Sequence, residues 1–154
     1  MNENRRFRFW YKCLLAVSIL NLIMGVIIAL FPGSFLFEAH TAALTEAFFG
    51  GELPEQAEQM RRFFFGIIGG TIAGYFLLQT LLVLFPFRNG ERWAWHAIFW
   101  AILLWFVTDS TLSILHGAFF NVWMINIPSL LLTLIPLVFT FKFFHAGNEG
   151  NVVE

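Results

Sequence analysis

Four long apolar stretches fill most of this chain, and they constrain its fold more than any other feature. They lie at residues 13–31, 63–85, 93–115 and 122–141. Each has about the 20 residues that a helix needs to cross a hydrocarbon core roughly 30 Å thick. The sequence therefore predicts an all-α polytopic membrane protein, in which a single domain over residues 1–154 forms a bundle of four transmembrane helices.

The composition agrees with this class and limits the possible partners. Hydrophobic residues make up 58% of the chain and charged residues only 12%, whereas charged residues are close to 25% of a soluble domain. The net charge of −1 gives no electrostatic reason to expect nucleic acid as a partner. Cys13 is the only cysteine, which excludes an intrachain disulfide and a cysteine-based metal site. No metal or cofactor is expected; the expected partners are membrane lipids, with a second copy of the chain or another membrane protein as alternatives.

The basic residues predict the orientation of the bundle, because short cytoplasmic loops are enriched in Lys and Arg. The first apolar stretch is longer than the apolar part of a signal peptide and lacks a small-residue cleavage pattern, so we interpret it as a retained span. Seven of the nine basic residues flank one face of the predicted bundle: Arg5, Arg6, Arg8, Lys12, Arg88, Arg92 and Lys142. Arg61 and Arg62 lie on the other face. Both termini are therefore predicted to be cytoplasmic.

Residues 33–62 form the one sizeable segment outside the predicted spans. Residues 41–49 are typical of a short amphipathic helix that Gly50 and Gly51 end, and Pro54 is placed as the first residue of a new helix. Glu58 and Arg62 form an i,i+4 pair, which is usually part of a solvated helix face. The apolar residues of this loop indicate a short helical cap that lies on the outer surface of the bilayer.

The second span carries a stripe of glycines at four-residue spacing, Gly66, Gly70 and Gly74. Residues four apart share one helix face, and a face without side chains lets another helix approach backbone to backbone. We therefore expect this stripe to be a helix-packing surface, against a helix of the same chain or of a second copy.

Asp109 is the only acidic residue inside the four apolar stretches. A carboxylate in hydrocarbon costs roughly 2.5 kcal/mol or more, so it normally faces the bundle interior, a partner or water. On a helix it shares a face with two polar residues that follow it, and the second and fourth spans bring further polar side chains to a similar depth. The predicted polar pocket consists of Asp109, Ser113, His116, Asn126, Ser129 and Thr71.

Several sequence pieces resemble a pattern found in small uncharacterised four-span inner-membrane proteins of bacteria. They are the turn at residues 88–95, Asp109 and Ser110 with Ser113, the run at residues 116–121, and Asn126. The resemblance covers the second to fourth spans. It implies a helical bundle in a bacterial inner membrane, and it implies no particular activity.

Two functional hypotheses from different classes follow. The first, which we favour, is a non-enzymatic membrane bundle that binds a lipid or small apolar ligand or serves as a subunit of a membrane assembly. The glycine stripe, the 21 phenylalanines and the lack of a second intramembrane carboxylate support it. The alternative is a proton-linked transporter, channel or membrane enzyme in which Asp109 carries a proton and His116 relays it. In a purely structural role, Asp109 would accept hydrogen bonds from Ser113, Asn126 or Arg62 and fix the helix register.

Overall fold

The computed structural model describes residues 3–145, which are helical apart from short connections and contain no β-strand. The elements in order are α1 (Glu3–Leu30), η1 (Phe35–Phe37), α2 (Glu38–Phe49), α3 (Glu55–Leu82), η2 (Val83–Phe87), α4 (Arg92–Leu115), α5 (Phe119–Asn121), η3 (Val122–Asn126) and α6 (Ile127–His145). Four stretches are long and apolar enough to cross a membrane: Asn4–Leu30, Glu55–Phe87, Arg92–Leu115 and Phe119–Phe144. The predicted all-α fold with four such helices is confirmed.

The helices extend beyond the predicted apolar stretches, because polar and basic residues at their ends are compatible with helix. The second stretch has 33 residues, about 50 Å at 1.5 Å per residue, which exceeds a hydrocarbon core of about 30 Å. Its first two turns, before Phe63, carry Glu58, Arg61 and Arg62 and extend past the apolar part. Two π-helical turns accompany prolines: η2 contains Pro86, and η3 ends at Asn126, two residues before Pro128. Proline lacks a backbone N–H and so interrupts the regular ladder.

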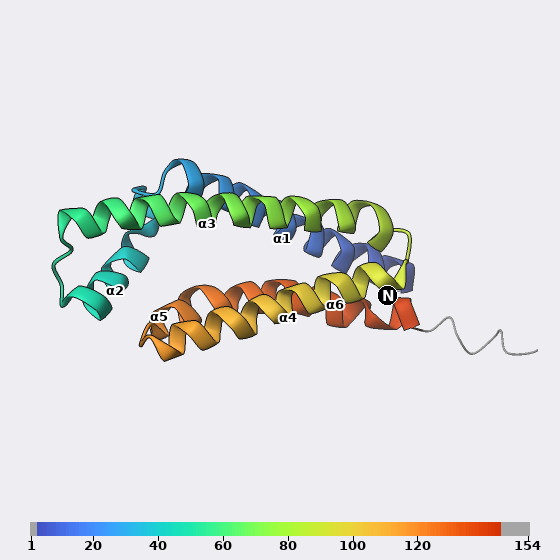
Figure 1. The fold of residues 1–154 in the computed structure, drawn as a ribbon. Helices are drawn as coiled ribbons and strands as arrows, with labels where there is room; N and C mark the ends of the chain where they lie inside the picture. The colour runs from blue at the N-terminus through green and yellow to red at the C-terminus, as the bar shows by residue number, and fades with distance from the viewer. Residues whose placement is uncertain (1–2, 146–154) are drawn as a thin grey trace, which may run out of the picture.

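The four long helices form two antiparallel pairs (Figure 1). In one pair α1 packs along α3, and in the other α4 packs along α6. Both ends of the described chain lie at one end of the bundle, which we call the terminal end. The opposite end carries α2 and α5, and we call it the cap end.

The α1–α3 pair is held by a backbone-to-backbone contact between small residues. A Cβ atom added to Gly25 would lie 2.6 Å from the Ala73 nitrogen, and one added to Gly69 would lie 2.8 Å from the Ala29 Cα. Gly25 and Ala29 are four residues apart on α1, as are Gly69 and Ala73 on α3. Two small-residue faces therefore meet, as in other close helix pairs of membrane proteins.

Within the chain, the packing face of the second span therefore lies one position away from the predicted stripe; packing of the stripe against a second copy stays a prediction. A Cβ added to Gly70 or Gly74 would meet no described atom within 4 Å, and one added to Gly66 would reach only the Ala29 carbonyl oxygen at 3.6 Å. Successive helical residues point about 100° apart, so Gly69 faces α1 while Gly70 does not. The expectation of close packing within one chain agrees with the structure, but through Gly69.

The two pairs meet at the terminal end in an aromatic and aliphatic core. Its fully buried members include Leu14 of α1, Val83 and Phe87 of η2, and Leu137 of α6. The Trp10 ring stacks on Phe139 with 4.4 Å between centroids, which joins α1 to α6 directly. Burial of these large side chains holds the two pairs together at this end.

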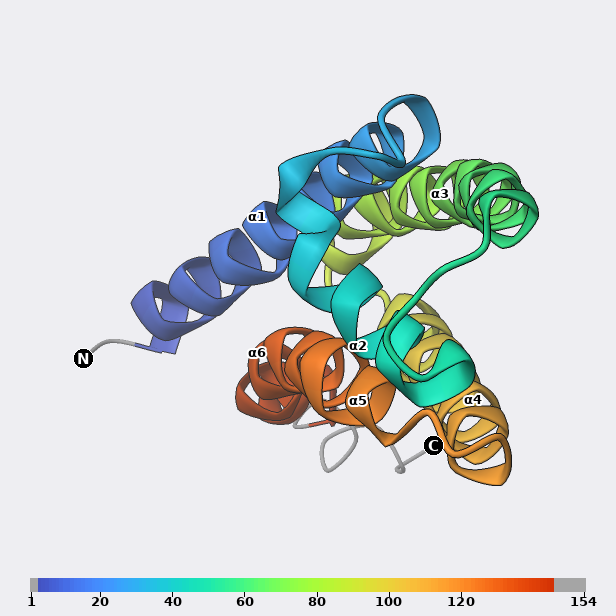
Figure 2. The same cartoon turned by 90° about the vertical axis from the view of Figure 1, so that its left-hand side faces the viewer.

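At the cap end, α2 lies across the space between the two pairs (Figure 2). The helix begins directly after η1 and ends at Gly50, whose φ of 67° is the left-handed conformation that glycine adopts without a Cβ penalty. The predicted helix at residues 41–49 is thus present and begins three residues earlier, and α3 begins at Glu55, directly after Pro54. On its exposed side the cap presents Phe35, Leu36, Phe48 and Phe49.

We expect Gly69→Ala to destabilise the protein and Gly70→Ala to leave it stable. The added methyl at position 69 would clash with backbone atoms of α1 that cannot rotate away, at a cost of about 1–3 kcal/mol. At position 70 the methyl has open space, and alanine favours helix by up to about 1 kcal/mol. Thermal unfolding of both variants in the same detergent tests this. Equal melting temperatures would show that Gly69 does not form the α1–α3 contact.

Candidate functional site

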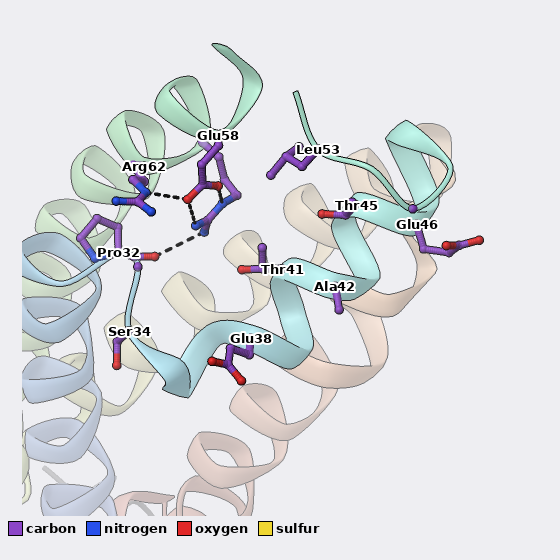
Figure 3. Close-up of a pocket in the computed structure, with 13 residues that line it drawn as sticks. Pro32, Ser34, Glu38, Thr41, Ala42, Thr45, Glu46, Leu53, Glu58 and Arg62 are labelled. Atoms are coloured by element: carbon purple, nitrogen blue, oxygen red, sulfur yellow. Dashed lines mark hydrogen bonds and ion pairs between the residues drawn. The ribbon is translucent and has the colours of Figure 1, made fainter. Parts of the chain in front are cut away.

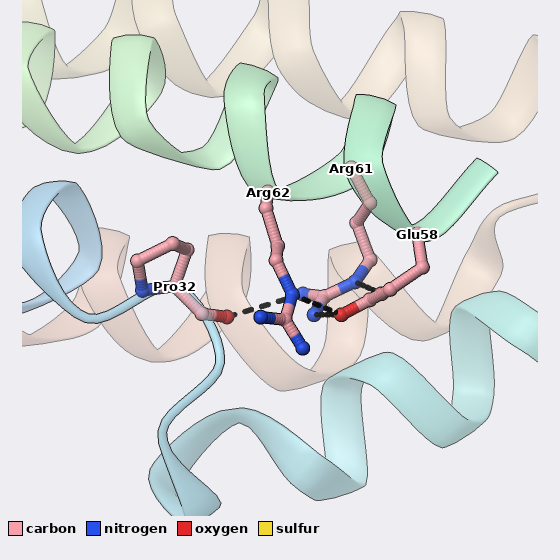
Figure 4. Close-up of polar contacts among 4 residues, drawn as sticks. All are labelled: Pro32, Glu58, Arg61 and Arg62. Carbon is pink, nitrogen blue, oxygen red and sulfur yellow. Dashed lines mark hydrogen bonds and ion pairs between the residues drawn. The ribbon is translucent and has the colours of Figure 1, made fainter. Parts of the chain in front are cut away.

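A buried arginine joins α3 to the end of α1 at the cap end. Arg61 donates from Nε and Nη2 to the two carboxylate oxygens of Glu58, at 2.6 and 2.9 Å, and from Nη1 to the Pro32 carbonyl oxygen at 3.3 Å. Figure 4 shows this arrangement between α3 and the loop after α1. The residue is only 8% exposed, and its guanidinium also lies 5.1 Å from the Phe65 ring centroid. The pairing with Glu58, and an acceptor for each of the three guanidinium nitrogens, make this burial tolerable.

Arg62 belongs to the same group but remains accessible. Its Nε donates to Glu58 Oε1 at 2.5 Å, and its side chain is 58% exposed. The predicted i,i+4 pair of Glu58 and Arg62 is therefore present. The interpretation as a solvated face holds for Arg62, but not for Arg61. We call Glu58, Arg61 and Arg62 the arginine cluster.

Two open cavities adjoin the arginine cluster. The larger has a volume of about 660 Å³ and lies between α2, the arginine cluster and the loops that flank α2. Figure 3 shows Thr41 and Thr45 of α2 across this cavity from Glu58 and Arg62. The smaller has a volume of about 460 Å³ and is lined by Leu30, Phe31, Pro32, Gly33, Ser34 and Arg62. Both lie where the apolar end of α1 gives way to polar loop residues.

A second polar group joins α4 to α5. The amide Nδ2 of Asn121 donates to Asp109 Oδ2 and to Ser113 Oγ, both at 2.9 Å. Asp109 is half-buried and Ser113 is buried. The Asp109 carboxylate thus has a hydrogen-bonding partner at the start of the fourth apolar stretch. We call Asp109, Ser113 and Asn121 the amide cluster.

His40 of α2 extends the amide cluster toward the arginine cluster. Its Nε2 lies 3.4 Å from Asn121 Oδ1. Because that amide donates through Nδ2, its oxygen accepts, and the histidine proton is on Nε2. The His40 ring also contacts Phe65, with centroids 5.5 Å apart, and Phe65 touches Arg61. Polar and aromatic contacts therefore run from α3 through α2 to α5 and α4.

The surroundings of His40 favour its neutral form. Burial lowers its pKa below the ordinary value of 6.5 and the nearby Arg61 charge lowers it further, while the hydrogen bond with Asn121 acts in the opposite direction. A protonated His40 would leave its site more readily than a neutral one, so acidification below this ordinary value weakens the docking of α2.

The structure brings together only part of the predicted polar pocket. Asp109 and Ser113 meet through Asn121, but Asn126 is fully buried and donates instead to Ser110 Oγ at 3.0 Å. His116 follows the last residue of α4 and is exposed there. It is not bonded to Asp109 in the described part of the chain. Hydrogen bonds therefore do not join Asp109, His116 and Asn126 to one another, because α4 ends at Leu115 and the two asparagines of the fourth span have different partners.

Two further predicted members also lie outside the amide cluster. Thr71 is exposed on α3, and its hydroxyl donates to the Ile67 carbonyl oxygen of the preceding turn at 3.0 Å. Ser129 is half-buried, and its side chain forms no hydrogen bond within residues 3–145. Neither side chain is hydrogen-bonded to Asp109, Ser113 or Asn121, so equal depth along the helices was not enough to predict a shared site.

Sequence reasoning missed His40 and underestimated Arg61. His40 lies in the connecting segment, where no spacing rule relates it to residue 121. The only signal was a titratable ring among the apolar residues of the cap. Arg61 could not be distinguished from its neighbour Arg62 by charge, and its contact with the Pro32 carbonyl depends on the tertiary fold.

Asn121 separates the two titratable side chains that it contacts, His40 and Asp109. An amide lies between His40 and the carboxylate, and an amide does not titrate in the ordinary pH range. Asp109, Asn121 and His116 line neither of the two cavities. Within residues 3–145, no three His, Cys, Asp or Glu side chains are grouped so that they could share a metal ion.

No family model, curated protein or solved structure matches this chain. The resemblance to four-span bacterial inner-membrane proteins therefore stays a prediction.

We expect Asn121→Leu to loosen α2 and the start of the fourth span. The substitution keeps a similar volume but leaves Asp109, Ser113 and His40 without their shared partner, which costs about 1–3 kcal/mol for buried groups. Amide hydrogen exchange over residues 38–49 measures the loosening, and His116→Ala, at an exposed position, is the matched control. Unchanged exchange in Asn121→Leu would show that the amide cluster does not hold α2.

Proposed function

We propose that this chain is a non-enzymatic integral membrane protein that binds a lipid at its cap end. The observation that carries the proposal is the smaller cavity, which combines exposed apolar side chains with a charged one. Leu30 and Phe31 are 66% and 61% exposed at the end of α1, and the guanidinium of Arg62 lies beside them. An amphipathic molecule presents the same two chemistries over the same short distance.

The rest of the surface favours a lipid over a soluble ligand. Phe63 and Phe64 follow Arg62 on α3 and are 64% and 49% exposed. The cap adds the exposed apolar side chains of residues 35, 36, 48 and 49. Exposed aromatic and aliphatic side chains next to basic ones are typical of segments at the boundary between acyl chains and headgroups.

Membership in a larger membrane assembly is the second form of this proposal. The face of α3 with Gly70 and Gly74 has no neighbour within the described chain at these positions, and Thr71 lies beside it. Such a face admits the close approach of another helix. A second copy of the chain and a different membrane protein both fit this surface.

A proton-linked transporter, channel or membrane enzyme remains the alternative of a different class. It needs Asp109 to exchange a proton with a neighbouring titratable group. Asn121 occupies the Asp109 Oδ2 position where such a group would act, and His116 lies beyond the end of α4. The lipid-binding proposal has the stronger support for this reason.

The proposed orientation places the termini in the cytoplasm of a cell membrane, with a bacterial inner membrane as the proposed setting. Its support is the excess of basic residues at the terminal end. In a Cys13→Ser background, an impermeant maleimide added to intact cells should label Glu46→Cys and should label Asn89→Cys only after permeabilisation. The opposite pattern, or labelling of both from one side, would contradict this orientation.

We expect lipid contacts to concentrate at the cap-end cavity. The protein is reconstituted with a phospholipid that carries a photoactivatable group near its glycerol backbone, and adducts are mapped by peptide mass spectrometry. The proposal predicts enrichment at residues 30–36 and 60–64 over the equally exposed Leu104 and Val138. Adducts spread evenly over all exposed apolar positions would mean that lipid only surrounds the protein.

A further inference from the structure

We infer that the smaller cavity is selective for anionic phospholipid and that Arg62 binds the lipid phosphate. This inference rests on the proposed function and specifies its ligand class. It follows from the difference between two adjacent arginines. Arg61 is buried and uses all three guanidinium nitrogens in hydrogen bonds. Arg62 is restrained by Glu58 and keeps donors for a ligand.

Glu58 accepts hydrogen bonds from both arginines, but among the described residues only Arg61 has every guanidinium nitrogen in a hydrogen bond. Arg61 uses Nε, Nη1 and Nη2 in hydrogen bonds to Glu58 and Pro32. Arg62 uses Nε alone, and within residues 3–145 its Nη1 and Nη2 donate to no other group. The two free nitrogens form one edge of a planar guanidinium, the geometry that binds two phosphate oxygens at once. Because Glu58 already restrains the side chain, binding costs less conformational entropy than it would for a freely rotating arginine.

The surroundings of Arg62 are suited to an anion. The guanidinium lies over Gly33, where an added Cβ would be 3.4 Å from Cζ and 3.6 Å from each terminal nitrogen. Arg62 is the only charged residue that lines the smaller cavity. The larger cavity, in contrast, is lined by three acidic residues, Glu38, Glu46 and Glu58, as well as by Arg61 and Arg62. In Figure 3 Glu46 points away from Arg62. An anion is therefore favoured on the Gly33 side.

One polar side chain, Ser34, complements the guanidinium at this cavity. The Ser34 hydroxyl oxygen accepts from the Leu36 backbone N–H at 3.4 Å, which leaves its own proton available to donate. The exposed Leu30 and Phe31 supply the apolar part of the lining. The phosphate of a phospholipid can bind the polar residues while its acyl chains contact the apolar ones. A free phosphate or a soluble glycerol phosphate can contact only the polar residues. The cavity therefore fits a lipid.

The inference is tested by native mass spectrometry of the purified chain with phosphatidylglycerol, phosphatidylcholine or soluble glycerol phosphate. Phosphatidylglycerol should be retained in preference to phosphatidylcholine, and Arg62→Gln should weaken its retention by about tenfold, the effect of losing one charge-assisted pair of hydrogen bonds. Arg92→Gln removes an exposed arginine at the terminal end and is the matched control. Gly33→Leu, which covers the guanidinium and keeps its charge, should weaken retention in the same way.

The possible outcomes separate this inference from the proposed function. Equal retention of the two lipids, or unchanged retention in Arg62→Gln and Gly33→Leu, overturns the inference and leaves lipid binding in place. Competition by glycerol phosphate at concentrations equal to the lipid overturns the assignment to a lipid. A wild-type protein that retains no phospholipid overturns both the inference and the proposed function.

Discussion

The close contact of Gly25 with Gly69 and Ala73 sets the positions of the other features at the cap end. It fixes α1 and α3 in antiparallel register, so that each turn toward the cap brings the next pair of residues together. Ala29 lies at Gly69 and Gly66, and Gly33 then lies at Arg62. The loop after α1 reaches Arg61 for the same reason, through the Pro32 carbonyl. A shift of α1 along α3 by one helical turn would move Arg62 away from Gly33 and so separate two residues that line the smaller cavity.

The polar side chains at the cap end fall into two roles. Arg61, His40 and the amide cluster connect α3, α2, α5 and α4, and most of their donors are used within the protein. Asp109 belongs to this group: its hydrogen bond from Asn121 offsets part of the cost of a carboxylate at that depth. The second role is that of Arg62, which is held by Glu58 on one side and exposed on the other. Asp109 is thus hydrogen-bonded within the protein, whereas the accessible charge is that of Arg62.

The sequence predicted the helices well and their contacts poorly. Hydropathy and length are enough to predict the four apolar helices, because these signals are local. Gly50 and Pro54 are likewise enough to predict a separate helix between the first two. The packing face depends on which of two small-residue stripes in the second span meets span one. Gly66, Gly70 and Gly74 form a more regular stripe than Gly69 and Ala73, and only the partner face of Gly25 and Ala29 distinguishes them. Likewise, depth along a helix predicted the level of Asp109 but not its partner, which depends on where α4 ends and how α5 begins.

The central claim is that a guanidinium held by Glu58 at the cap end binds a lipid phosphate, and phosphorus–nitrogen dipolar NMR tests it most directly. Arginine-labelled protein is placed in bilayers of phosphatidylglycerol, and the Arg62 signal is assigned by its absence in Arg62→Gln. The account predicts that the terminal nitrogens of Arg62 couple to lipid phosphorus as strongly as hydrogen bonds with an N···O distance of about 2.8 Å require. Those of Arg61 should couple more weakly. An Arg62 signal that shows no coupling to phosphorus in these bilayers would contradict the account.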